Sequence, residues 1–460
     1  MHPLAVIVAG LLALFAVVGF FRTLQTPRNA QWLIVGMILA AGMAIQVDRV
    51  GNQINMTYLN ALQQQRASIY LAFGSVLFLG MLIHFGRLRL NTMPVQGLLL
   101  LAIQIVASIL RFYHEGPVDA ATSLVFALVT MTPIMLLLPH ALERWDDWTR
   151  LVRVFGFAAA LWAFLVAIQV VIDHRQLVLG AQSRFTGLLG NPQGTGLYMA
   201  PMTVALIWLI LNDTERRLRW IWIGSLCLMS VYTLWTGSRT CILVTGIGTI
   251  FVLYSRAGKA VLLLPVFLAL VYGALQVALM LGFSSDALER LGSKQDTRSL
   301  VWTILLEDAM ANPLLGTGFK QTRANENSYL VAFGAYGIAG GGLVLVLTIV
   351  SFFLMLKVMR LRSYLPPGRK QIADLILGFN AMFFAGAFFE WYIISRLEGM
   401  LPYMLIYSVM TRRMIDKLTT EAPEEDPQPM IEDAPDYSAW DHYGRDDRAE
   451  PQTDSNPSTA

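Results

Sequence analysis

The sequence has little charge and almost no cysteine. Only 14% of its 460 residues are Asp, Glu, Lys or Arg, whereas soluble domains carry roughly 25%. A surface that faces water on all sides is therefore excluded. The only two cysteines, Cys227 and Cys241, both lie in predicted helices. Neither a disulfide framework nor a cysteine metal site is expected, and redox chemistry is excluded as the function.

Apolar residues make up 55% of the chain. They gather in stretches close to the ~20 residues that a helix needs to cross a membrane. The sequence predicts an all-α polytopic membrane protein with about 12–14 transmembrane helices. The predicted spans are residues 3–20, 31–47, 68–85, 93–112, 121–139, 151–172, 195–211, 219–235, 239–254, 260–282, 328–356, 371–389 and 398–411. No basic segment precedes the first span and no small-residue cleavage site follows it, so it is predicted to be a span and not a cleaved signal.

Lysine and arginine predict the orientation. Most of them lie in the turns after the odd-numbered spans and after the last span, and such turns face the cytoplasm. We therefore expect a bacterial inner-membrane protein with one large periplasmic loop, residues 283–327. The basic clusters at 216–219 and 357–370 are interpreted as topology signals.

The C-terminal residues differ from the rest of the chain. Residues 418–460 contain twelve Asp or Glu and two Arg, with several prolines and no helical apolar period. They predict a disordered, acidic, cytoplasmic tail after a membrane domain at 1–417. Nucleic acid is not an expected partner.

Unusual polar motifs fall on the predicted periplasmic side. They lie at 184–187, 190–194, 236–240, 296–298, 316–320 and 325–330. Three of these groups end where a helix enters the membrane. Free backbone N–H groups and the helix dipole make each such N-terminus favourable for anions. Three N-termini with added arginines suit a diphosphate.

Single residues in these motifs have a simpler interpretation as well. Ser238, Asn327 and Ser328 are types that cap helix starts, and each alone favours that role. Arg239 differs, because it lies between two apolar spans with hardly any loop to carry it into water. A cation there needs a partner or a polar cavity, which favours a functional role.

The long loop predicts a helix of its own. Asp296 or Thr297 can cap it, and Asn312 with Pro313 would end it. Its apolar stripe would be Leu300, Val301, Ile304 and Leu305. Such a helix on the membrane surface is either a brace or a lid that presents Arg298 to a lipid-borne substrate.

Taken together, the motifs resemble those of the O-antigen ligase and polysaccharide polymerase family of bacterial membrane glycosyltransferases, over about residues 180–400. The resemblance rests on Arg184 to Gly187 with Asn191-Pro192, the Ser238-Arg239 turn, Thr297-Arg298 with Trp302, the Gly316-x-Gly318 motif, and Asn327-x-Tyr329-Leu330. It implies about a dozen helices, one large outer loop and a donor carried on undecaprenyl diphosphate. The acceptor would be a glycan, lipid A or a protein.

The chain departs from the family at one position. Family members commonly have His-Asn where this chain has Glu326-Asn327. If that position supplies the general base, Glu326 inherits the role, since a carboxylate in a partly dry site can work near neutral pH. Alternatively, Glu326 is an acid near the helix start, beside Lys320 and Arg323.

The predicted site therefore has three groups of residues. Glu326 and Arg239 are catalytic; Arg184, Arg239 and Arg298 bind the diphosphate; Ser238, Asn327, Tyr329, Lys320 and Arg323 support them. No metal or cofactor is expected, because the predicted outer face carries no Asp-x-Asp pair. Glu390, Arg396 and Glu398 could line the acceptor path or form an internal ion-pair network.

Two other functions stay open. A transporter or flippase for polysaccharide or lipid-linked glycan, without catalytic activity, would share the spans and the basic cavity. Transporters, however, tend to place charges at the midplane and to have repeated halves with broken helices. A scaffold whose tail recruits envelope polysaccharide assembly proteins is the second alternative. In each case membrane lipids are partners.

Overall fold

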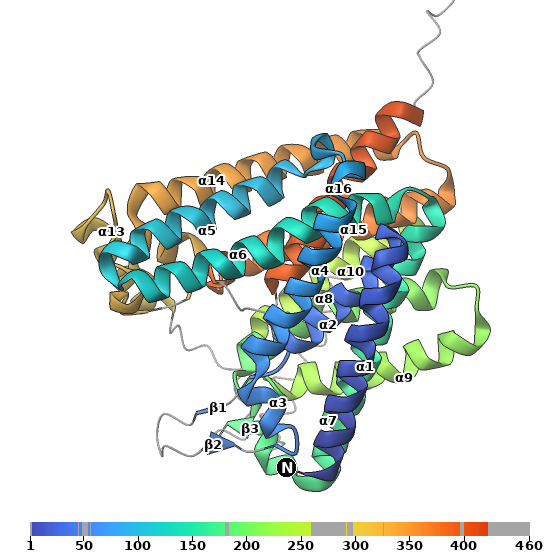
Figure 1. Cartoon of the computed structure of the whole chain (residues 1–460), viewed down its shortest axis with the longest axis horizontal. Helices are drawn as coiled ribbons and strands as arrows, with labels where there is room; N and C mark the ends of the chain where they lie inside the picture. Colours follow the sequence, from blue (N-terminus) through green and yellow to red (C-terminus); the bar gives the residue numbers. More distant parts are fainter. Residues whose placement is uncertain are drawn as a thin grey trace, which may run out of the picture. The chain divides into compact units, whose positions relative to one another are not determined.

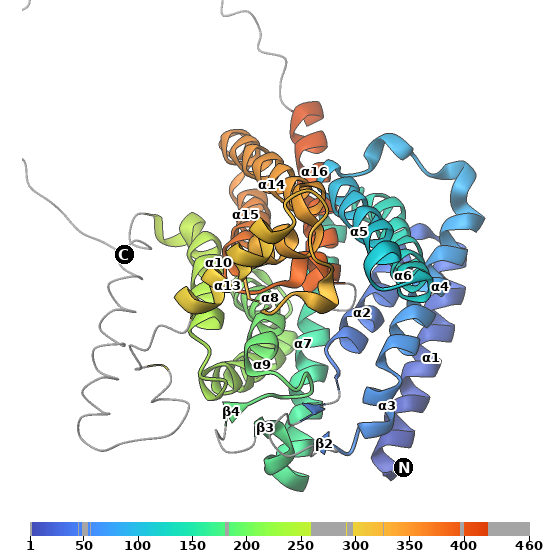
Figure 2. The same cartoon turned by 90° about the vertical axis from the view of Figure 1, so that its left-hand side faces the viewer.

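Packed α-helices make up most of the described chain, as Figure 1 and Figure 2 show. The computed structural model describes residues 2–44, 46–47, 54–55, 57–179, 184–258, 291, 298–324, 326–395 and 400–421. Residues Met1–Thr419 belong to one compact unit. The helices are α1 (Pro3–Gln25), α2 (Ala30–Ala41), α3 (Asn60–Gln64), α4 (Arg66–His84), α5 (Val95–His114), α6 (Pro117–Leu137), α7 (Trp145–Asp173), α8 (Pro192–Asn212), α9 (Arg216–Trp235), α10 (Arg239–Ala257), α13 (Arg298–Ala311), α14 (Ser328–Arg362), α15 (Pro367–Ala387) and α16 (Met400–Glu421). Two short antiparallel hairpins pair β1 (Gln46–Val47) with β2 (Ile54–Asn55) and β3 (Val178–Leu179) with β4 (Arg184–Phe185).

Among the described residues, eight helices are long and apolar enough to cross a membrane, so the chain is a multi-pass membrane protein. They are α1, α4, α5, α6, α7, α8, α9 and α14. The predicted spans 31–47, 239–254, 371–389 and 398–411 overlap with α2, α10, α15 and α16, which are helical but shorter or less apolar. The predicted span 260–282 lies outside the described residues.

Helices α8 and α10 run in the same direction and pack on each other, and α9 connects them by running the opposite way. Asn191 caps α8 and Ser238 caps α10, each through a side-chain oxygen that accepts backbone N–H bonds. The Sγ of Cys241 lies 2.9 Å from the carbonyl oxygen of Gly196, so both helices begin side by side. Helix α14, capped by Asn327, also begins at this end. We call it the capped end; all three predicted helix starts are confirmed.

The opposite end of the helices is rich in arginine, and we call it the basic end. There Arg256 of α10 donates to the side chain of Asn212 at 3.2 Å, so α8 and α10 also finish together. The ring of His84, at the end of α4, contacts the carbonyl oxygen of Thr23 in α1 at 2.9 Å. Turns that are far apart in the sequence therefore meet at this end.

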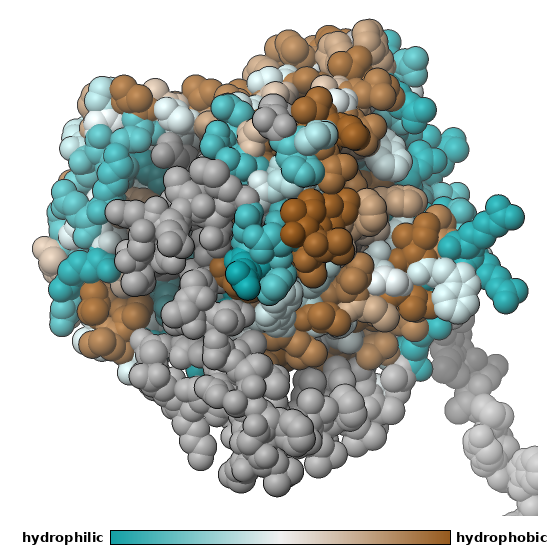
Figure 3. All heavy atoms as spheres, turned by 90° about the horizontal axis from the view of Figure 1, so that it is seen from below, coloured by the Kyte–Doolittle hydropathy of each residue, from teal (hydrophilic) through white to brown (hydrophobic). Residues whose placement is uncertain are grey.

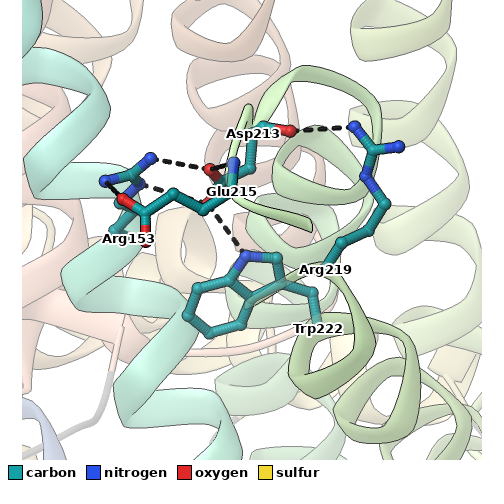
Figure 4. Close-up of polar contacts among 5 residues, drawn as sticks. All are labelled: Arg153, Asp213, Glu215, Arg219 and Trp222. Carbon is teal, nitrogen blue, oxygen red and sulfur yellow. Dashed lines mark hydrogen bonds and ion pairs between the residues drawn. The ribbon is translucent and has the colours of Figure 1, made fainter. Parts of the chain in front are cut away.

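A buried carboxylate holds the corner between α7, α8 and α9 at the basic end (Figure 4). The guanidinium of Arg153 donates to both oxygens of Asp213 at 2.7 and 3.1 Å, and to Glu215 at 2.7 Å. The indole of Trp222 and the backbone N–H of Glu215 each donate to Asp213 at 3.0 Å. Burial alone would raise the pKa of Asp213, but these hydrogen bonds outweigh it and lower the pKa.

The core contains large aromatic side chains, and part of the exterior is apolar. Trp148, Trp162 and Trp222 are fully buried between helices. Large apolar side chains are also exposed: Val171 is 87% exposed and Val118 is 78% exposed. Figure 3 shows broad hydrophobic areas reaching the surface on the face seen from below. An exterior of this kind is stable in lipid and not in water.

Helix α14 is broken near its start, at its tenth residue. Gly337 has φ 58° and ψ −156°, which no helix contains. In an unbroken helix the N–H of Ile338 would donate to the carbonyl oxygen of Gly334. Here Ile338 donates to Pro313 and Gly334 accepts from Thr317, both at 2.8 Å. The segment before α14 therefore fills the break.

Helix α13 confirms the helix predicted in the long loop, and it ends just before Asn312. The predicted apolar stripe is only partly correct. Leu305 is buried, together with Asp308, whereas Leu300 is 67% exposed. The helix packs on α14 through the Leu305 side. The predicted capping residues 296–297 lie outside the described residues.

The last helix reaches into the first residues of the predicted tail. Helix α16 continues to Glu421, so residues 418–421 are helical. Ile415 and Leu418 are 3% and 4% exposed, and their apolar contacts extend the helix beyond the predicted span. Residues 422–460 lie outside the described residues.

Candidate functional site

A tight turn joins α9 to α10 at the capped end. Gly237 has φ 60°, a conformation that glycine adopts without strain. Ser238 is buried, and its hydroxyl accepts a hydrogen bond from the N–H of Cys241 at 3.3 Å. Arg239 follows as the first residue of α10 and is exposed. The turn thus holds Arg239 at a helix N-terminus, where the helix dipole favours anions.

Arg184 reaches this turn from strand β4. Its Nε donates to the carbonyl oxygen of Thr236 at 2.9 Å. The neighbouring Phe185 is fully buried and stacks on Tyr232 and Trp235, with ring centroids 5.0 and 5.1 Å apart. This stacking holds strand β4 against the end of α9. Because Arg184 is the residue next to Phe185, the same apolar contact positions Arg184 beside the turn.

Arg298 reaches the same turn from the first residue of α13. Its Nη2 donates to the hydroxyl of Thr240 at 2.7 Å. The guanidinium also lies over the ring of Phe389, 4.6 Å from its centroid. Arg184 and Arg298 therefore bind the two sides of the turn that carries Arg239. The structure brings the three predicted arginines to one turn.

The start of α14 has an unusual backbone. Asn327 has φ 73°, the one non-glycine residue with positive φ in the described part of the chain. Its Oδ1 accepts from the N–H groups of Tyr329 at 3.0 Å and Leu330 at 3.2 Å. Asparagine tolerates this conformation because its side chain bonds locally. The sharp bend sets the direction of Glu326, the residue just before it.

Three consecutive residues after α15 connect α14 to the arginine turn. Ser328 contacts Glu390, Tyr329 contacts Phe388 and Arg298 contacts Phe389. The backbone N–H and hydroxyl of Ser328 both donate to the carbonyl oxygen of Glu390, at 3.0 and 2.5 Å. The rings of Tyr329 and Phe388 lie 4.7 Å apart. The segment 388–390 thus holds the starts of α13 and α14 in place. The predicted acceptor-path residues 396 and 398 lie outside the described residues.

Glu326 is half-buried. Its Oε2 is buried, and none of the described residues donates a hydrogen bond to that atom. A carboxylate oxygen in this situation is costly unless another group approaches it. The Oε2 of Glu326 has no hydrogen-bond donor among the described residues.

Lys320 and Arg323, predicted to support the site, form ion pairs elsewhere. Lys320 Nζ lies 2.6 Å from Asp119 in α6. Arg323 pairs with Asp308 at 2.7 Å and Glu307 at 2.9 Å in α13, and hydrogen bonds to these carboxylates raise the pKa of Arg323. Both residues tie the loop before α14 to its neighbours. These ion pairs therefore give no support to the interpretation of Glu326 as the acidic partner of Lys320 and Arg323.

Sequence reasoning missed a buried ion pair in α5. Arg111 is 3% exposed, donates to Ser123 at 2.5 Å, and has its Nε 3.9 Å from Glu115. Its guanidinium also lies 5.4 Å from the ring centroid of Phe319, which packs on Trp391. The sequence feature that could have indicated this pair is the presence of two opposite charges four residues apart at the end of an apolar stretch. This pair positions the same loop that leads to Glu326.

The arrangement can hold an anion. It combines guanidinium groups with the N-terminus of α10, both of which favour phosphate oxygens. In the described ranges, no three His, Cys, Asp or Glu side chains gather in a way that could hold a metal ion. No protein-family model and no curated protein matches this chain.

Proposed function

We propose that the chain is a membrane glycosyltransferase of the O-antigen ligase or polysaccharide polymerase type. It transfers a glycan from undecaprenyl diphosphate to a glycan, lipid A or protein acceptor. The proposed setting is the bacterial inner membrane, with about 12–14 spans, the capped end toward the periplasm and the C-terminus in the cytoplasm. One observation supports this most strongly: Arg184 and Arg298, distant in sequence, both bind the turn of Arg239.

In this proposal, Arg184, Arg239 and Arg298 hold the diphosphate. Breaking a sugar-to-diphosphate bond needs little protonation, since the leaving oxygens share the negative charge. It needs fixed positive charge, which guanidinium groups and a helix N-terminus supply. A carbonyl oxygen is among the contacts that orient Arg184, and a hydroxyl and an aromatic ring are among those that orient Arg298.

Glu326 is the proposed general base. The acceptor hydroxyl oxygen attacks the anomeric carbon and gives its proton to Glu326. The bond between that carbon and the diphosphate breaks, and the electron pair leaves with the diphosphate. Direct displacement inverts the anomeric configuration. The buried Oε2, to which no described residue donates, supports this assignment.

One observation favours the alternative of a transporter for polysaccharide or lipid-linked glycan. Helix α14 is broken at Gly337, and broken helices are typical of transporters. In transporters, however, the freed backbone groups bind substrate or ions. Here Gly334 and Ile338 bond to the segment 313–318. The break therefore serves to seat the loop before α14, and the enzyme remains our conclusion.

The first test replaces the two proposed catalytic residues in cells. Arg239→Ala and Glu326→Ala should both abolish glycan extension or attachment while the protein still inserts. Arg175→Ala is the matched control, because Arg175 is exposed at the same end and lies outside the site. Wild-type activity in both site variants would eliminate the assignment.

The same cells identify the product. With the protein inactivated, loss of long chains with single repeats retained indicates a polymerase. Accumulated lipid-linked polymer indicates a ligase. Unchanged surface polysaccharide together with a transport defect would favour the transporter.

A further inference from the structure

A hollow of about 260 Å³ opens at the basic end, away from the candidate site. Its walls come from separate parts of the chain: the 3-10 turns Phe85–Arg87, Leu90–Thr92 and Leu138–Leu142, and helix α16. The polar lining residues are Arg87, Arg89, Thr92, His140, Glu143 and Arg413. Distant turns thus place three arginines around one space.

The hollow has an excess of positive charge. Its one carboxylate, Glu143, lies 3.8 Å from Arg28 and 3.8 Å from His140. In the part of the chain that the structure describes, no carboxylate pairs with any of the three lining arginines. A group of like charges around a cavity attracts an anion.

Arg413 is the most constrained of the three. It is half-buried in α16, and its Nε is a buried atom that has no hydrogen-bond partner within the described residues. A buried guanidinium N–H without an acceptor is unfavourable. An oxygen anion in the hollow would satisfy it.

Apolar side chains next to the hollow are exposed. Leu82 and Ile83 at the end of α4 are 51% and 59% exposed, and Phe85 and Leu90 are 53% and 60% exposed. In a membrane protein such side chains contact lipid. The hollow therefore opens at a place where the arginine side chains lie next to the hydrocarbon of the membrane.

We propose that this hollow binds a phosphate-bearing anion, supplied by the headgroup of an acidic phospholipid. Arginine forms paired, charge-assisted hydrogen bonds with phosphate oxygens. Basic pockets at the ends of transmembrane helices suit such headgroups. A soluble phosphate compound has the same anion, but it has no hydrocarbon chain to lie along the lipid-facing side chains next to the hollow.

The test measures binding of fluorescent phosphatidylglycerol to the full chain in phosphatidylcholine nanodiscs. Arg89→Gln with Arg413→Gln should weaken binding about tenfold for each arginine lost, the ratio expected for one charged hydrogen bond. The matched control is Arg216→Gln with Arg217→Gln, two exposed arginines at the same end. It removes the same charge and should leave the Kd unchanged.

A second arm adds inorganic phosphate to the protein in pure phosphatidylcholine nanodiscs. If phosphate raises the unfolding temperature of wild type but not of the hollow variant, and the fluorescent lipid does not bind, the anion comes from solution. Equal lipid Kd values in the hollow and control variants would overturn the proposal. If the double variant does not insert into the membrane, the single variant Arg89→Gln replaces it, because an exposed side chain can be changed without disturbing the fold. Its lipid Kd is then compared with that of the control variant.

Discussion

Two arginine clusters at opposite ends of the helices are built differently. At the basic end, Arg153 binds the carboxylates of Asp213 and Glu215 (Figure 4). At the capped end, the contacts of Arg184 include a carbonyl oxygen, and those of Arg298 include a hydroxyl and an aromatic ring. Carboxylates neutralise a guanidinium, whereas neutral acceptors orient it and keep its charge.

The difference separates a structural role from a binding role. A neutralised arginine stabilises the fold, and its loss should change stability. An arginine oriented by neutral groups can attract an anion, and its loss should change binding. Lys320 and Arg323 show that position alone is a poor guide, because they lie near the capped end yet pair with carboxylates.

The largest expected change in stability comes from Asp213→Ala. It leaves Arg153 with one partner and the indole N–H of Trp222 without its acceptor. We expect unfolding in detergent to need about 3 kcal/mol less free energy, as for other broken buried pairs. Glycan transfer by the folded fraction should stay at the wild-type level. A lowered transfer rate in folded protein would contradict the separation of the two clusters.

Glu215→Ala is the control for that prediction, because Glu215 contacts the same arginine but its side chain is 55% exposed. A change below about 1 kcal/mol is expected. Acid sharpens the comparison. The pKa of Asp213 is lower in the folded chain, so its stabilisation is present above the unfolded value of about 3.9 and is lost as pH falls through the folded pKa. Asp213→Ala should lack this part of the acid destabilisation.

Gly316→Ala should have the next largest effect, at the capped end. Gly316 has φ 74°, and a Cβ there would lie 2.3 Å from the carbonyl carbon of Ala335. Backbone cannot move aside as a side chain can, so we expect a loss of about 2 kcal/mol in unfolding free energy. Gly342→Ala in α14 is the control, since its Cβ would meet only Ile338 at 3.9 Å. Equal stability of the two variants would show that the loop does not seat in the break of α14.

The sequence predicted what short-range patterns control. Apolar stretches predicted the long helices, α8 among them, and capping residues predicted the starts of α10 and α14. The helix in the long loop and its end before Asn312 followed from the same rules. The gathering of three arginines at one turn followed from placing these helix starts on one side.

Contacts between residues far apart in the chain could not be predicted from the sequence. The pairing of Lys320 with Asp119 joins residues two hundred positions apart, and no local pattern indicates it. The break in α14 depends on hydrogen bonds to the segment 313–318. Because those bonds are long-range, the single glycine Gly337 gives no sign of the break in the sequence. Helix α16 continues to Glu421, beyond the predicted span, and its residues Ile415 and Leu418 are buried.

The smallest expected effect on stability comes from Arg298→Lys. Lysine keeps the charge but loses the planar contact with Phe389 and the directed bond to Thr240, so unfolding should change by about 1 kcal/mol or less. Binding of the lipid-linked donor should weaken about tenfold, because paired contacts to the diphosphate are lost. Arg323→Lys is the matched control, as Arg323 pairs with Asp308 and Glu307. The KM for the donor should rise only in the first variant; a rise of the same size in both would mean that the charge near the capped end, and not its orientation, sets donor affinity.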